Sequence, residues 1–276
     1  MTDATELLPG LAERWVTYRG ARIRVFEGGP GRPLLLVHGY GGAAWNFSEL
    51  APLLPRRRLV IPDLPGHAAS ARLPAAPTLS AYADAVAACL DGQAHDVLGH
   101  SMGGVVALRL AERRPELVRR IVLAAPAGIS SSSRWGEITI TLAGIVQPAR
   151  LAGRRVDRIA CSRLLRRLVF GPFEVSNPDA LTERAVHGLL RGPRIATDAL
   201  SAGRALAADD PRLDLERVRC PVLVLWGARD RQVPIDDGFE YARRLRAPIR
   251  MIADCGHLLI SERPEVCARA ALEFLR

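Results

Sequence analysis

Ser101 lies in the pentapeptide Gly99–Gly103, which has the form G-x-S-x-G. An apolar run precedes it and a helix-like stretch follows, so we expect the serine on a tight turn between a strand and a helix. Gly99 and Gly103 supply the small neighbours that such a turn needs, because its backbone passes close to the helix. The turn would hold the hydroxyl at the N-terminus of the helix, where the helix dipole favours a developing oxyanion. The pattern predicts a nucleophilic serine.

A serine hydroxyl needs a base within hydrogen-bonding distance before it acts as a nucleophile. The chain has six histidines, and His257 directly follows the last predicted strand. Loops at the carboxyl ends of parallel strands gather at one edge of a sheet, so His257 and Ser101 can converge. His38 precedes a glycine turn, and we interpret it as shaping that loop. We therefore predict His257 as the base.

The base in turn needs an acid that orients it. Asp230 directly follows the apolar run of residues 221–226, and the chain order serine, aspartate, histidine is the one known for this motif. Asp236 and Asp237 suit the first turn of a helix better, where they complement its dipole. Asp254 is too near His257 in sequence to be the first choice. We predict Asp230 as the orienting acid.

Acyl transfer also requires two preorganised donors for the oxyanion. The residue after the nucleophile, Met102, would provide one through its backbone N–H. The glycine-rich loop of residues 38–42 (HGYGG) can fold close to the site, and we choose the N–H of Tyr40 as the second donor.

Short apolar or alternating runs that would position these residues recur along the chain. The predicted strands are residues 15–18, 21–27, 33–38, 59–62, 95–98, 120–125, 221–226 and 249–252, and the predicted helices are residues 78–90, 101–113 and 263–275. The alternation of strand and helix predicts an α/β fold with a mostly parallel central sheet flanked by helices.

Residues 127–210 show helical patterns but no strand signal. We expect a core domain formed by residues 1–126 and 212–276, with a helical cap over residues 127–211. One pattern in the cap places apolar residues from Val156 to Leu168 on a single stripe, among six arginines. We interpret these arginines as the solvated outer face of a cap helix. Contact with an anionic lipid or an acidic substrate is the alternative.

The composition is that of an ordinary globular protein, with 49% hydrophobic and 24% charged residues among 276. The net charge of +9 is carried by arginine without any lysine, which we attribute to coding bias rather than to a nucleic-acid partner. The five cysteines form no CxxC pair, and no ligand cluster or dinucleotide fingerprint is found, so we expect no disulfide framework, no metal and no cofactor.

The polar N-terminus and the lack of a long apolar run predict a cytoplasmic protein without stable membrane insertion. Homo-oligomerisation is left open.

These motifs together resemble the α/β-hydrolase superfamily, in its branch of small capped bacterial esterases, C–C bond hydrolases, enol-lactonases and cofactor-free haloperoxidase-like enzymes. The matching segments are RIRVFEGGPGRPLLLVHGYGG, IPDLPGHAAS, GHSMGG, PVLVLWGARDRQVP and CGH. The resemblance implies the same roles for Ser101, Asp230, His257, Tyr40 and Met102. The sequence departs from the family pattern at Ala68 and Ala69, where relatives commonly show a glycine. Haloalkane dehalogenases and epoxide hydrolases of this family carry aspartate at the position of Ser101. The serine therefore argues against both of these activities.

The leading hypothesis is hydrolysis of a carboxylic ester or related small acyl substrate through an acyl-enzyme. Cleavage of a C–C bond in a vinylogous diketone is an alternative that uses the same residues. Such relatives commonly have asparagine before the nucleophile, whereas this chain has His100. A low-turnover hydrolase-fold receptor is the third reading, which a complete catalytic constellation disfavours.

Overall fold

The fold is built on a single sheet. The computed structural model describes residues 7–132, 152–171, 174–195 and 198–276. Within them, eight strands pair in the order β1-β2-β4-β3-β5-β6-β7-β8. Their bounds are β1 Ala12–Tyr18, β2 Ala21–Gly28, β3 Arg32–Val37, β4 Arg57–Pro62, β5 His95–His100, β6 Val118–Ala124, β7 Val222–Gly227 and β8 Ile249–Ile252. Strand β2 runs antiparallel to β1 and β4, and the other neighbours are parallel. The predicted α/β fold with a mostly parallel sheet is confirmed.

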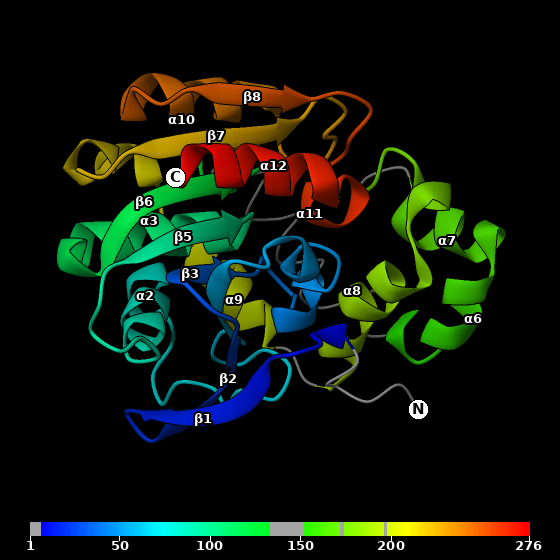
Figure 1. Cartoon of the computed structure of the whole chain (residues 1–276), viewed down its shortest axis with the longest axis horizontal. Coiled ribbons are helices and arrows are strands. Elements are labelled where there is room, and N and C mark those ends of the chain that lie inside the picture. Colours follow the sequence, from blue (N-terminus) through cyan, green and yellow to red (C-terminus); the bar gives the residue numbers. More distant parts are fainter. Residues whose placement is uncertain (1–6, 133–151, 172–173, 196–197) are drawn as a thin grey trace.

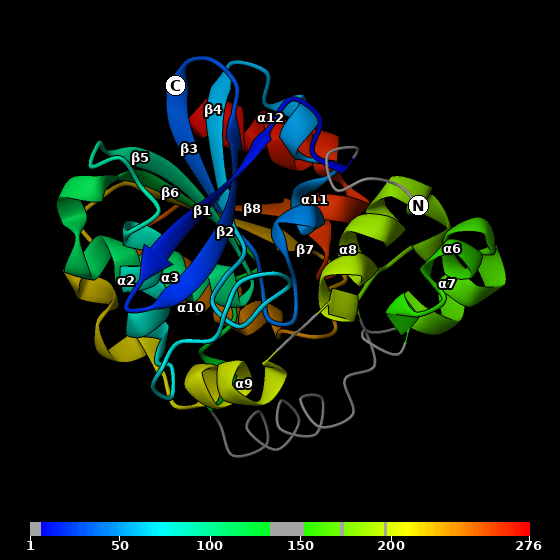
Figure 2. The ribbon, with the colours of Figure 1, turned by 90° about the horizontal axis from the view of Figure 1, so that it is seen from below.

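Helices cover both faces of this sheet (Figures 1 and 2). Helices α2, α3 and α10 lie on one face and α12 on the other (Figure 2). The helices that follow core strands are α2 Leu79–Ala87, α3 Met102–Arg113, α10 Ile235–Leu245, α11 Leu259–Glu262 and α12 Pro264–Phe274. Short 3-10 helices are η1 Ala44–Phe47, η2 Ala51–Leu53, η3 Pro115–Leu117, η4 Ser130–Ser132, η5 Pro178–Ala180, η6 Pro211–Leu213 and η7 Leu215–Arg217. The central strands β5 and β7 are buried along their whole length, as expected for strands covered on both faces.

The described residues between β6 and β7 form four α-helices and no strand. These are α6 Val156–Cys161, α7 Arg163–Phe170, α8 Glu183–Ile195 and α9 Ala199–Ala207. The prediction of one helical stripe over residues 156–168 is wrong in its second half. The helix ends at Cys161, and the Ser162 hydroxyl caps a new helix by accepting a hydrogen bond from Leu165 N at 3.4 Å. Residues 133–151, 172–173 and 196–197 of the predicted cap lie outside the described residues.

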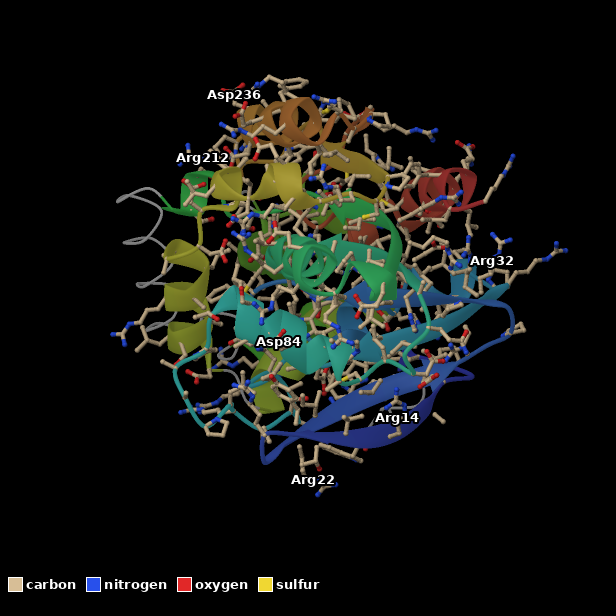
Figure 3. All side chains as sticks on the ribbon, turned by 90° about the vertical axis from the view of Figure 1, so that its left-hand side faces the viewer. Arg14, Arg22, Arg32, Asp84, Arg212 and Asp236 are labelled. Carbon is tan, nitrogen blue, oxygen red and sulfur yellow. The ribbon has the colours of Figure 1, made fainter. Side chains whose placement is uncertain are left out.

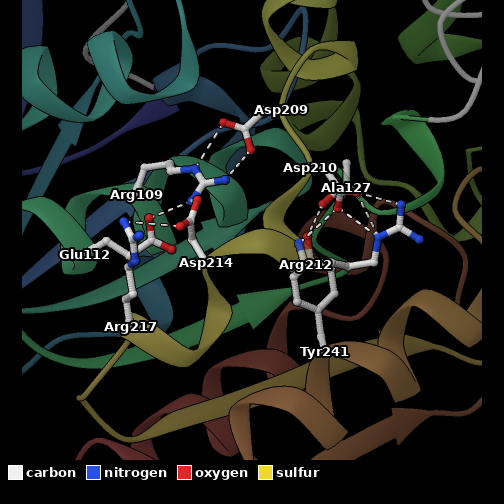
Figure 4. Close-up of polar contacts among 9 residues, drawn as sticks. All are labelled: Arg109, Glu112, Ala127, Asp209, Asp210, Arg212, Asp214, Arg217 and Tyr241. Carbon is white, nitrogen blue, oxygen red and sulfur yellow. Dashed lines mark hydrogen bonds and ion pairs between the residues drawn. The ribbon is translucent and has the colours of Figure 1, made fainter.

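Polar contacts fix both ends of this insertion to the core helices (Figure 4). At the start, the Tyr241 hydroxyl on α10 donates to the carbonyl of Ala127 at 2.5 Å. At the end, Arg109 on α3 forms ion pairs with Asp209 at 2.6 Å and with Asp214 at 3.2 Å. Arg109 is on the helix that begins after Ser101, so the insertion is anchored on the element that carries the predicted nucleophile.

The loop that departs from the family pattern adopts a conformation that usually favours glycine. Ala68 has φ of 47°, in the left-handed region, and is buried. The loop is braced at Ser70, whose hydroxyl donates to the Asp63 carbonyl at 2.8 Å and accepts from Arg24 N at 2.9 Å. The surrounding hydrogen bonds therefore hold Ala68 in this conformation without a glycine.

Candidate active site

Ser101 occupies the sharp turn between β5 and α3, at the N-cap position of the helix. Its backbone has φ of 53° and ψ of −123°, a strained combination for a residue with a side chain. Ser101 N donates to the Ala124 carbonyl at 3.0 Å, and its own carbonyl accepts from Gly104 N at 2.9 Å. These bonds hold the turn in place, and the side chain sits at the positive end of the α3 dipole.

Gly99 and Gly103 are required by close contacts at this turn. A Cβ atom on Gly99 would lie 2.4 Å from the carbonyl oxygen of Gly103. A Cβ atom on Gly103 would lie 2.2 Å from the carbonyl oxygen of Val37, at the end of β3. Both distances are shorter than real Cβ contacts, so no larger residue fits without moving the backbone. Small residues are needed at these two positions, as predicted, because β3, β5 and α3 pass close to one another at the turn.

His257 and Asp230 complete a row of hydrogen bonds that starts at Ser101. The Ser101 Oγ lies 3.0 Å from His257 Nε2, and His257 Nδ1 lies 2.8 Å from Asp230 Oδ2. The His257 side chain is 2% exposed and that of Asp230 is 1% exposed. When His257 Nδ1–H donates its hydrogen bond to the Asp230 carboxylate, Nε2 carries a lone pair that can accept the serine proton. The structure therefore brings the three predicted residues together from three separate loops.

Asp230 has a second set of partners in its own turn. Its Oδ1 accepts hydrogen bonds from Gln232 N at 2.9 Å and from Val233 N at 3.0 Å. The two carboxylate oxygens are thus divided between the turn and His257. Asp254, the alternative acid, is exposed and pairs with Arg229 at 2.6 Å instead.

The glycine-rich loop after β3 lies directly against Ser101. A Cβ atom on Gly39 would be 3.0 Å from the Ser101 Cβ, which places the adjacent Tyr40 backbone beside the serine. Two buried histidines hold the loop through hydrogen bonds to backbone N–H groups. His38 accepts from Leu64 N at 2.9 Å, and His67 accepts from Gly41 N at 3.3 Å.

Both supporting histidines are neutral acceptors. Burial lowers the pKa of His38 and that of His67 to about 4. The interpretation that His38 shapes its loop agrees with this placement. The hydrogen bond of His67 to Gly41 N was not expected from the sequence.

His100, which the sequence reading left without a role, contacts the loop of the predicted base. Its Nε2–H donates to the backbone carbonyl of His257 at 3.0 Å. Burial lowers the pKa of His100 to about 3, so the ring is neutral near pH 7. The residue before Ser101 thereby holds the backbone of His257, the predicted base.

Glu262 is a further buried group that the sequence reading missed. Its carboxylate accepts from Gly256 N at 2.8 Å, from Ser176 N at 3.1 Å and from Asn177 N at 2.9 Å. Gly256 precedes His257, whereas Ser176 and Asn177 belong to the insertion. One buried carboxylate therefore joins the loop of the predicted base to the inserted helices.

We expect Glu262→Gln to lower both stability and turnover. An amide offers one acceptor oxygen and turns its NH₂ group toward the backbone donors, so about 2 kcal/mol of unfolding free energy should be lost. The matched control is Glu265→Gln, because Glu265 is exposed on the neighbouring helix α12. Chemical denaturation and ester turnover of both variants measure the effect. Equal behaviour of the two variants would show that the hydrogen bonds of the Glu262 carboxylate have no influence on the site.

A metal-binding cluster and a membrane-spanning helix are both absent from the residues that the structure describes. No group of three or more histidine, cysteine, aspartate or glutamate side chains among these residues could hold a metal ion. No helix in the same residues is long and apolar enough to cross a membrane.

The mostly parallel sheet, the strained serine turn and the hydrogen-bonded row define a hydrolase-type enzyme. A sequence model described as the alpha/beta hydrolase family matches residues 34–270 of the chain. Because this match covers most of the sequence, the chain belongs to the α/β-hydrolase family, as the sequence motifs indicated.

Proteins similar in sequence include an esterase and an acetyltransferase component. A pimeloyl-[acyl-carrier protein] methyl ester esterase from Aromatoleum aromaticum is 34% identical over an alignment of 252 residues, which covers 85% of this chain and 94% of the relative. The dihydrolipoyllysine-residue acetyltransferase component of the acetoin cleaving system from Pseudomonas putida is 31% identical over an alignment of 268 residues, which covers 93% of this chain and 67% of the relative.

Solved structures add support for the fold. A bromoperoxidase from Bacillus anthracis has a TM-score of 0.79 at 18% identity, over 96% of this chain and 99% of that one. A thermophilic esterase from Thermogutta terrifontis has a TM-score of 0.75 at 23% identity, over 96% and 98%.

Proposed function

We propose that the protein hydrolyses a carboxylic ester or related acyl compound through a covalent acyl-enzyme. The observation that carries this proposal is the buried row from Asp230 through His257 to Ser101, with distances of 2.8 and 3.0 Å. In this mechanism Ser101 Oγ attacks the carbonyl carbon while His257 takes its proton. The protonated imidazole, stabilised by Asp230, then returns the proton to the departing alcohol. Water attacks the acyl-enzyme by the same route and releases the acid.

The developing oxyanion would be held by the backbone N–H groups of Tyr40 and Met102. Met102 begins α3, so its N–H belongs to the unpaired donors at a helix N-terminus. The contact of Gly39 with Ser101 supports the placement of Tyr40 beside the same oxygen.

We further propose that residues 127–211 act as a cap that shapes the acyl pocket and excludes water. Close packing of α8 on η1 supports this role. A Cβ atom on Gly188 would lie 2.3 Å from the carbonyl oxygen of Trp45, just beyond the loop that carries Tyr40. The Glu262 carboxylate adds a second attachment, because it holds the insertion to the loop of His257.

Ester hydrolysis is favoured over its two competitors. The relatives named as methyl ester esterases support an acyl ester as substrate. Diketone cleavage would use the same row, but His100 stands where asparagine is common in such enzymes. A receptor with little turnover does not require the strained serine turn that this chain maintains.

A chromogenic short-chain ester tests the covalent step. We expect a burst of chromophore that approaches one equivalent per enzyme if deacylation is slower than acylation. Intact-protein mass spectrometry of the quenched reaction should show the added acyl group.

Activity should persist in EDTA, since the mechanism uses no metal. A chelator-sensitive activity restored by a divalent ion, or turnover of a diketone with no ester turnover, would contradict the proposal.

A further inference from the structure

Two leucines on the outer face of α7 are unusually exposed. Leu164 is 66% exposed and Leu168 is 69% exposed, and they lie four residues apart on one side of the helix. The opposite side of α7 packs inward, where Phe170 is buried in the apolar cluster of the insertion and Leu165 and Val169 pack against it. Single exposed apolar residues are common on protein surfaces, but an adjacent pair on one helical turn forms a continuous apolar stripe.

Arginines run alongside this leucine stripe. Arg163 and Arg167 are exposed and precede Leu164 and Leu168 by one position each, so the two stripes are neighbours on the helix. From residue 154 to residue 167 the sequence contains six arginines and one aspartate. The outer surface of α6 and α7, which projects from the side of the molecule in Figure 1, is therefore both apolar and strongly cationic.

A cleft of about 570 Å³ adjoins the same stripe. It is lined by Arg167 and Leu168 from α7 and by Arg229 and Arg231 from the turn after β7. Arg167 pairs with Asp179 and Arg229 with Asp254, while Arg231 forms no ion pair or hydrogen bond with the residues that the structure describes. The cleft thus offers a guanidinium group to an anionic ligand, beside the exposed leucines.

We propose that this surface, formed by Arg163, Leu164, Arg167, Leu168 and Arg231, docks reversibly on an anionic phospholipid membrane. The leucine side chains would enter the boundary between headgroups and acyl chains, and the arginines would bind lipid phosphates, for which the planar guanidinium is well suited. Charge complementarity favours an anionic leaflet. An acidic protein without an apolar surface would bind the arginines but leave Leu164 and Leu168 exposed to water. The proposal concerns this surface alone and does not depend on the chemistry at Ser101.

Co-sedimentation with sucrose-loaded vesicles tests the proposal. We use phosphatidylcholine vesicles with and without about one third phosphatidylglycerol, and the Ser101→Ala variant throughout so that lipid hydrolysis cannot confuse the result. Binding is expected to the anionic vesicles only, and it should weaken as salt screens the arginines. The variant Leu164→Gln/Leu168→Gln should bind at least about tenfold more weakly. Arg163→Gln/Arg167→Gln should show a similar loss.

Matched controls separate this surface from general charge and apolarity. Leu213 is 77% exposed but lies on η6, away from α7, so Leu213→Gln should bind normally. Figure 3 views the molecule from the side opposite α6 and α7 and labels Arg32. Arg32 and Arg56 are both exposed, and a Cβ atom on Gly31, next to Arg32, would lie 2.4 Å from the Arg56 carbonyl oxygen. Arg32→Gln/Arg56→Gln should also bind normally. Absence of binding to anionic vesicles, which a solvated surface or a protein partner would give, overturns the proposal. Equal binding of the leucine variant and its control does so as well.

Discussion

Replacing Ser101 with alanine is expected to abolish ester hydrolysis while leaving the fold intact. Removal of a catalytic serine in a comparable row lowers kcat on the order of 10⁶-fold, because the base and the acid have nothing to activate. The turn should survive, since this chain already holds alanine at positive φ at Ala68 and Ala125. Steady-state kinetics with a chromogenic ester and the melting temperature measure the two effects separately.

A fluorophosphonate probe gives an independent test of the same residue. It should label the wild-type protein at Ser101 and leave Ser101→Ala unlabelled. Ser80→Ala is a suitable control, because Ser80 lies on the distant helix α2 and should retain both labelling and activity. Undiminished labelling of Ser101→Ala would mean that another residue is the nucleophile.

The strands and the hydrogen-bonded row could be predicted from sequence because both leave local signals. Buried parallel strands need continuous apolar runs, and the three predicted site residues, Ser101, Asp230 and His257, follow the ends of those runs. The motif order then specified how the three residues pair.

The supporting contacts left no such signal. Glu262 and His100 act through backbone groups that are near only in the folded chain, so their side-chain types alone do not reveal the partner. The break at Ser162 was also missed, because a stripe that continues through a capping residue looks like one helix. Tertiary packing decided that Leu164 and Leu168 face outward.

Asp230→Asn is the sharpest test of how the row operates. Asp230 Oδ1 already accepts two backbone N–H groups of its turn, and only Oδ2 faces His257. In the variant the amide oxygen should keep the turn bonds, which leaves the NH₂ group pointing at Nδ1. That group donates, so Nδ1 must accept and the ring hydrogen moves to Nε2, facing Ser101. The base then has no lone pair for the serine proton.

We therefore expect kcat to fall on the order of 10⁴-fold, the effect of the same change in a serine protease. The melting temperature should change little, since the turn keeps its acceptor. Asp254→Asn is the matched control, because Asp254 lies three residues before His257 but is exposed and paired with Arg229. It should retain near-normal kcat. The reverse outcome, with Asp230→Asn active and Asp254→Asn impaired, would make Asp254 the orienting acid. If Asp230→Asn lost stability but kept kcat, its carboxylate would serve the turn alone.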